Sequence, residues 1–129
     1  MADESFKEFV LDQLSALPDV RVRAMFGAQG IFAGEYFFAI LDEGRLFFRT
    51  DEASQPDYTA RGMGPFTYEL DGREVAFQYH EVPPDVLEVS QELVAWARKA
   101  IQVAINHKQA QRNPKAKPRR TKSQGRINN

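Results

Sequence analysis

The first residues whose type and spacing suggest chemistry are three glycines, Gly27, Gly30 and Gly34, in the stretch RVRAMFGAQGIFAGEYF. Glycine-rich loops bind phosphate where a strand leads into a helix, because the amides at the helix start face the anion. Here another apolar, β-rich segment follows, and no Lys-Ser/Thr pair comes after the glycines. We therefore expect a kink or bulge in one long strand. A ligand-contacting bend, in a small-molecule-binding domain or an enzyme, is the alternative.

Other candidate catalytic groups have simpler structural explanations. His80 adjoins Glu81, but neighbours on a strand point to opposite faces and do not converge on a metal ion. The pairs Asp42-Glu43 and Asp51-Glu52 flank a turn or a helix start, where carboxylates accept hydrogen bonds from local amides. No serine lies in a G-x-S-x-G motif, and cysteine is absent. We expect no catalytic residue, no metal, no cofactor and no enzymatic activity.

Aromatic side chains are frequent in the middle of the chain and could stack nucleobases. Lys and Arg are sparse among them, and this part of the chain is acidic, so a core or an interface is the expected role. The residues concerned are Phe37, Phe38, Phe47, Phe48, Phe66, Phe77 and Tyr79.

The net charge of −1 conceals two regions of opposite sign. Residues 1–106 hold nine Lys/Arg and all 18 Asp/Glu, whereas residues 107–129 hold eight basic residues and no acidic one. The basic residues are Lys108, Arg112, Lys115, Lys117, Arg119, Arg120, Lys122 and Arg126. So few apolar residues cannot offset the entropy of ordering, which predicts a disordered tail. It could bind nucleic acid weakly without sequence preference, fold onto the acidic body, or only aid solubility.

The bulk composition is that of one globular domain. The chain has 129 residues, of which 43% are hydrophobic and 27% charged. The absence of cysteine suits a reducing compartment, and no apolar run approaches the roughly 18 residues of a membrane span. We expect a cytoplasmic protein with no membrane contact, divided into a domain over residues 1–106 and a tail over residues 107–129.

Periodicity and turn residues predict an α+β fold of order α-β-β-β-α-β-β-α with a five-stranded antiparallel sheet packed by helices. An amphipathic first helix ends at Pro18, a short helix covers about residues 54–61, and Ser90 can cap the last helix. Strands are expected at about residues 22–32, 36–41, 46–49, 65–70 and 73–80. Trp96 is expected on the buried stripe of the last helix, near Phe6 or Phe9.

The strand YFFAIL, residues 36–41, is apolar on both faces, with Tyr36, Phe38 and Ile40 predicted on one and Phe37, Ala39 and Leu41 on the other. Phe37 and Phe38 are therefore candidate interface residues, either in a homodimer or with a protein partner. A central strand covered by the chain itself is the alternative.

Three segments together resemble a known family. RAMFGAQGIF at residues 23–32, GPFTY at residues 64–68, and VPPDVL followed by ELVAWARKA at residues 82–100 are similar to the N-terminal domain of the TfoX/Sxy competence regulators. The resemblance covers about residues 5–105. It implies an α+β fold of the secretion-chaperone-like kind, a link to bacterial transcription and no catalytic residues. Full-length regulators carry a C-terminal helical domain, whose place a basic tail takes here.

Overall fold

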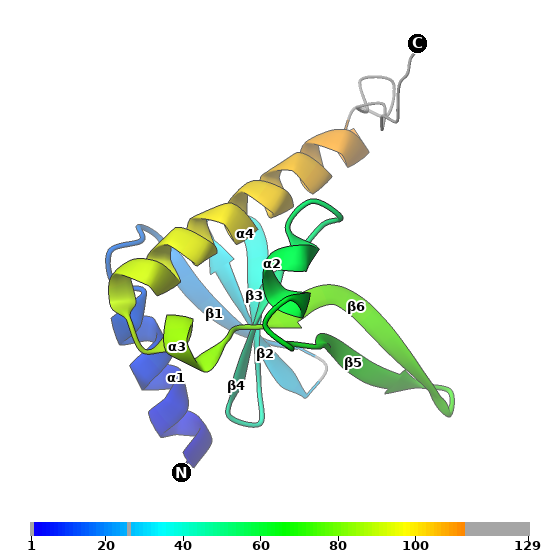
Figure 1. The fold of residues 1–129 in the computed structure, drawn as a ribbon, viewed down its shortest axis with the longest axis horizontal. Helices are drawn as coiled ribbons and strands as arrows, with labels where there is room; N and C mark the ends of the chain where they lie inside the picture. The colour runs from blue at the N-terminus through cyan, green and yellow to red at the C-terminus, as the bar shows by residue number, and fades with distance from the viewer. Residues whose placement is uncertain (1, 26, 113–129) are drawn as a thin grey trace.

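The computed structural model describes residues 2–25 and 27–112, which form helices on one side of an antiparallel sheet (Figure 1). The elements are α1 (Ala2–Gln13), β1 (Val20–Met25), β2 (Ala28–Ala33), β3 (Tyr36–Asp42), β4 (Arg45–Arg49), α2 (Gln55–Thr59), β5 (Pro65–Leu70), β6 (Arg73–Glu81), α3 (Pro84–Leu87) and α4 (Ser90–Arg112). The α+β class and the antiparallel sheet are as the sequence predicts. None of the described helices is both long and apolar enough to cross a membrane.

The sheet has six strands in the order β1-β2-β3-β4-β6-β5, one more than expected. The extra strand arises because the predicted long strand over residues 22–32 is a hairpin. Met25 pairs with Ala28, and Gly27 lies in the turn with a φ of 78°. The prediction of a kink within one strand is therefore wrong, because the positive φ of Gly27 serves a chain reversal. Gly30 lies inside β2 and pairs with Arg23.

The main core lies between the sheet and the helices. In Figure 1, α4 runs diagonally across the sheet and packs on β3 and β4, and its buried Ala97, Ala100 and Ala104 let the helix approach these strands closely. Helix α1 is held to α3 and to the start of α4 by one hydrogen bond each. Ser90 Oγ donates to the Gln13 carbonyl at 2.7 Å, and Gln13 Nε2 donates to the Leu87 carbonyl at 3.0 Å.

Phe38 lies within this core and is fully buried, with its ring centroid 5.9 Å from that of Phe48. Its prediction as an interface residue is therefore wrong. The cause is a register shift between β2 and β3, where Phe32 pairs with Phe37 while Ile31 pairs with Ala39. Phe38 is the extra residue, so the strict alternation expected along YFFAIL is interrupted. Phe37 remains on the opposite face of the sheet.

Trp96 is half-buried at the edge of the core. Its ring stands edge-on to Tyr58 of α2, with centroids 4.9 Å apart, and the guanidinium of Arg61 lies 5.2 Å from the ring centre. Phe6 and Phe9 of α1 instead face each other at 6.4 Å. The ring partner of Trp96 therefore comes from α2, which fills the space between α4 and β6.

Helix α4 continues to Arg112, six residues beyond the boundary expected at residue 106. His107, Lys108 and Arg112 are thus helical rather than part of a disordered tail. Lys108 Nζ lies 3.2 Å from Glu35 Oε1, which ties the last turns of α4 to the turn between β2 and β3. The remainder of the predicted tail, residues 113–129, lies outside the described residues.

Substitution of the two glycines of the first hairpin is expected to lower the unfolding free energy for different reasons. Gly27→Ala meets no atom within 4 Å and is expected to lose about 1 to 2 kcal/mol from its left-handed backbone alone. In Gly30→Ala the new methyl group would lie 2.9 Å from Phe37 Cε1 and 3.0 Å from Met25 Sδ, which we expect to cost about 1 to 3 kcal/mol through overpacking. Urea denaturation measures both losses.

The matched variants are Gly27→Asn and the double variant Gly30→Ala with Phe37→Leu. Asparagine tolerates the left-handed region, so it should recover part of the Gly27→Ala loss. Leucine removes the ring atom closest to the added methyl group. If Gly30→Ala costs as much unfolding free energy in the Phe37→Leu background as in the wild type, the close contact with the ring is not the cause.

Candidate functional site

The face of the sheet opposite the helices carries a second apolar cluster, to which only strands contribute among the described residues. Its buried members and the half-buried side chains around them are Ala28, Ile40, Phe47, Phe66 and Tyr79, with Phe37, Tyr68 and Phe77. We call this surface the helix-free face. Each of β2 to β6 contributes to it because alternate residues of a strand point to the same side.

One row of stacked rings on this face ends in an arginine at each side. Phe32 stacks on Phe37 with centroids 5.1 Å apart, and Phe37 lies 5.3 Å from Tyr79. The guanidinium of Arg23 lies 5.3 Å from the Phe32 centroid, and that of Arg49 lies 5.4 Å from the Tyr79 centroid. Such cation–π contacts hold the guanidinium groups against the rings while leaving their N–H groups available.

Tyr79 fixes the end of this row through its hydroxyl group. Arg49 Nη1 donates to Tyr79 Oη at 2.8 Å, and Tyr79 Oη donates to the Phe37 carbonyl at 3.3 Å. Burial raises the pKa of Tyr79, and the charge and hydrogen bond of Arg49 partly oppose this rise. The phenol therefore stays neutral at physiological pH and acts as a structural link.

A second row runs from β4 to the β5–β6 hairpin. Arg45 lies 5.5 Å from the Phe47 centroid, Phe47 meets Phe66 edge-on at 5.2 Å, and Phe66 meets Phe77 at 5.7 Å. Since β4 and β5 are separated by β6 in the sheet, Phe47 and Phe66 meet over β6 on the helix-free face.

The far end of the β5–β6 hairpin is apolar and open to solvent. Leu70 is 47% exposed and Val75 is 38% exposed. Leu70 lies two residues after Tyr68 and Val75 two residues before Phe77, so both point to the helix-free face and extend it outward. In Figure 1 this hairpin projects away from the helices.

The sequence alone did not place these arginines on one face of the sheet, because cations are few in residues 1–106 and only their two-residue spacing indicates a shared face. Arg21 and Arg23 alternate with Val20 and Val22, which pack toward the helices, and Arg45 and Arg49 flank Phe47 at two-residue spacing. The segments RVR and RLFFR contain this period-two signal. Four of the nine cations of residues 1–106 are thereby placed on one face.

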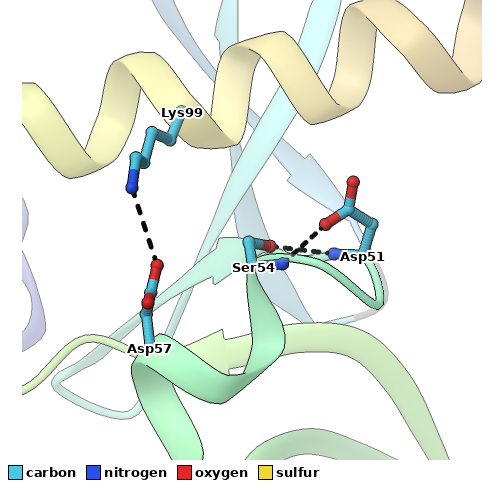
Figure 2. Close-up of polar contacts among 4 residues, drawn as sticks. All are labelled: Asp51, Ser54, Asp57 and Lys99. Atoms are coloured by element: carbon cyan, nitrogen blue, oxygen red, sulfur yellow. Dashed lines mark hydrogen bonds and ion pairs between the residues drawn. The ribbon is translucent and has the colours of Figure 1, made fainter.

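The carboxylate candidates near α2 serve local structure. Asp51 N–H donates to Ser54 Oγ at 3.0 Å and Ser54 N–H donates to Asp51 Oδ1 at 2.9 Å, which closes the turn before α2 (Figure 2). Figure 2 also shows Lys99 of α4 reaching Asp57, with Nζ 3.7 Å from Oδ2. Asp51 therefore stabilises a turn, as its position before a helix predicts.

The two hairpin turns at one end of the sheet enclose a cleft of about 360 Å³. It is lined by Gly27 and, among charged residues, by Glu4, Asp42 and Glu43. Three carboxylates disfavour a phosphate group, so the lining does not support a nucleotide at the glycine bend. No cluster of three potential metal ligands occurs among residues 2–25 and 27–112.

The predicted site residues lie in different parts of the structure. Phe37 lies half-buried on the helix-free face, whereas Phe38 belongs to the core beneath α4. Of the eight tail cations, Lys108 and Arg112 lie in α4. The other six, Lys115, Lys117, Arg119, Arg120, Lys122 and Arg126, lie outside the described residues.

The fold and this face together define a small α+β domain that layers helices on one side of an antiparallel sheet and leaves an arginine-flanked aromatic surface on the other. Residues 12–104 match the family described as TfoX N-terminal domain. The chain therefore belongs to the TfoX N-terminal domain family, as its sequence motifs suggest. No curated protein matches it significantly.

His80 is the buried histidine of the helix side, and its burial predicts a pH-dependent stability. It is 4% exposed, its Nδ1 lies 2.9 Å from Thr50 Oγ1, and its ring packs 5.9 Å from Tyr58. Burial lowers its pKa, so the folded state binds its proton more weakly than the unfolded state. The resulting stability is complete above the unfolded pKa of about 6.5 and is lost as the pH falls below it.

We expect His80→Asn to show a smaller loss of unfolding free energy between pH 7.5 and pH 5 than the wild type, measured by urea denaturation. His107→Gln is the comparison for an exposed histidine, whose pKa is lowered in the same direction by slight burial and by Arg49, and its effect is expected to be smaller than that of His80→Asn. All three proteins carry the same carboxylates, so the comparison isolates the histidine that is replaced. An identical pH dependence of wild type and His80→Asn would contradict this assignment.

Proposed function

We propose that the protein is a non-enzymatic binding module that acts as an accessory factor in bacterial transcription regulation through protein contacts. Family membership supports the link to competence regulators. The observation that carries the proposal is the helix-free face, where Leu70 and Val75 remain open beside the aromatic cluster. Partly exposed aromatic, aliphatic and arginine side chains are the groups that dominate the energy of protein interfaces.

The charges of the face favour a different protein over a second copy of this chain. Arg23, Arg45 and Arg49 stand among the rings, and Glu81 lies 3.7 Å from Arg45. A two-fold contact through this face would bring one arginine-rich surface against another. A partner with acidic groups around an apolar centre complements it better.

We expect the intact chain to capture a partner protein. A chain whose hairpin end is made polar should no longer capture it. The variant is Leu70→Ser with Val75→Ser in the full-length chain, and the measurement is quantitative affinity capture from bacterial cytoplasm with nuclease present. Exposed side chains are replaced, so the fold should persist, and thermal denaturation checks this. The captured protein is then purified and its Kd for both forms is measured, with at least a tenfold loss expected for the double variant.

The control is Phe9→Ser with Val89→Ser, which removes two other exposed apolar side chains that lie outside the helix-free face. It should bind the captured protein as the wild type does. Equal loss in both double variants, or no loss in either, would refute a role for the helix-free face. A captured protein unconnected with transcription would leave the face in place but overturn the regulatory role.

A further inference from the structure

Strand β1 forms one edge of the sheet and directs alternate backbone groups outward (Figure 1). The Gly34 N–H donates to the Asp19 carbonyl at 2.9 Å, so the backbone of Asp19 faces β2. Backbone groups alternate in direction along an antiparallel strand, and Val20, Val22 and Ala24 therefore direct their N–H and C=O groups away from β2. No described strand pairs with this side of β1, which we call the β1 edge.

The opposite edge of the sheet, formed by β5, is poorly suited to pairing. It begins with Pro65, which has no N–H group, and its register with β6 shifts between Pro65 and Thr67. It also carries the exposed Glu69. Proline, irregular register and charge are devices that keep edge strands from pairing. An added strand, above all an acidic one, is therefore expected at the β1 edge.

The side chains of β1 differ between its two faces. Val20 and Val22 pack against the helix-side core but are only half-buried, so a neighbouring strand would cover more of their surface. Arg21 and Arg23 lie on the helix-free face and are exposed. Because side chains alternate along a strand, the complement of β1 is a segment in which apolar and acidic residues alternate.

A basic cleft beside β1 strengthens this preference for acidic residues. Arg21 and Arg23 line a cleft of about 370 Å³ together with Lys108 of α4. The acidic neighbours are Asp19, whose Oδ1 lies 3.4 Å from Arg21 Nε, and Glu35, whose Oε1 lies 3.2 Å from Lys108 Nζ. The side chains of both pairs are exposed, and exposed ion pairs contribute little to stability. An incoming carboxylate therefore replaces either acidic partner at small cost.

A second copy of this chain does not suit the β1 edge. Two β1 strands related by a two-fold axis at Val22, in the middle of the strand, would place Arg21 of one copy directly opposite Arg23 of the other. Like charges in directly opposed positions destabilise a strand pair. The arginines therefore act against self-association and favour a partner of opposite charge.

We infer that the β1 edge binds an extended acidic segment of another protein, which adds a seventh strand to the sheet. The outward backbone groups of β1 supply the main-chain hydrogen bonds. The apolar residues of the segment cover Val20 and Val22. Its carboxylates pair with Arg21 and Arg23 on the other face. The six residues of β1 span about 20 Å, so a segment of about seven residues suffices.

The probe is the fluorescein-labelled peptide Glu-Val-Glu-Val-Glu-Val-Glu, titrated against the full-length chain in anisotropy measurements at about 150 mM salt. We expect saturable binding that Arg21→Ala with Arg23→Ala weakens about tenfold. The charge-matched control, Arg73→Ala with Arg98→Ala, changes two exposed arginines outside β1 and should bind as the wild type does. Thermal denaturation checks that both double variants remain folded.

Pairing through the backbone is tested with two N-methylated forms of this peptide. In antiparallel addition the peptide residues whose N–H groups face β1 are those on the valine face. Methylation of the valine nitrogens should then abolish binding, whereas methylation of the glutamate nitrogens should leave it intact; the reverse order indicates parallel addition. Both forms carry the same charge, so their attraction to the cations of residues 113–129 is the same.

Hydrogen exchange gives an independent readout. The amides of Val20, Val22 and Ala24 should exchange at least about tenfold more slowly with the peptide bound. Leu70→Ser with Val75→Ser should bind the peptide normally, because the β5–β6 hairpin lies at the other side of the sheet. Failure of the protein-contact proposal and failure of this inference are therefore distinguishable.

Four outcomes would overturn the inference. The first is the absence of saturable binding by the wild type. Equal affinity, or equal loss, for the two N-methylated peptides would exclude pairing through the backbone. Equal loss in the charge-matched control would indicate only general attraction of anions. Displacement of the labelled peptide by oligothymidylate of equal charge, as effective as displacement by the unlabelled peptide, would point to nucleic acid instead.

Discussion

The structure depends on one constraint, which is that a sheet with two apolar faces has all the described helices on only one of them. The close packing of α4 through Ala97, Ala100 and Ala104 brings a long helix directly onto β3 and β4. The short α2 and α3 then fill the remaining space on the same side. The other face must be covered by the strands themselves, because an uncovered row of rings would leave several hundred square ångströms of apolar surface in water.

The rings of the β5–β6 hairpin and the arginines cover this second face. Phe66 and Phe77 approach the rings of the central strands, and guanidinium groups cover ring faces that no helix reaches. Arginine suits this position since its planar group stacks on a ring and remains hydrated at its edge. The same arrangement that completes a second core therefore also creates a charged aromatic surface.

Features that depend on a few neighbouring residues, such as hairpin turns, could be predicted from the sequence. Asp71-Gly72, a dipeptide typical of two-residue hairpin turns, joins β5 to β6 with both φ values positive, and Glu43-Gly44 joins β3 to β4 in the same way. Gly27 was ambiguous because a bulge and a hairpin turn both use a left-handed residue, and only the pairing of Met25 with Ala28 distinguishes them. The position of Phe38 was unpredictable for a different reason. A one-residue register shift depends on the partner strand and leaves no signal in YFFAIL.

The candidate surfaces required knowledge of which strands are neighbours. RVR and RLFFR show alternation in the sequence, but their arginines meet the rings of Phe32, Phe47 and Tyr79 only after the strands pair. Phe47 and Tyr79 are already almost fully buried, so a partner gains little by covering them. Leu70 and Val75 retain about half of their surface, and completing the burial of each is worth on the order of 1 kcal/mol. Affinity at this face must therefore come from the hairpin end and the arginines, while the ring cluster supplies a rigid base that loses little entropy on binding.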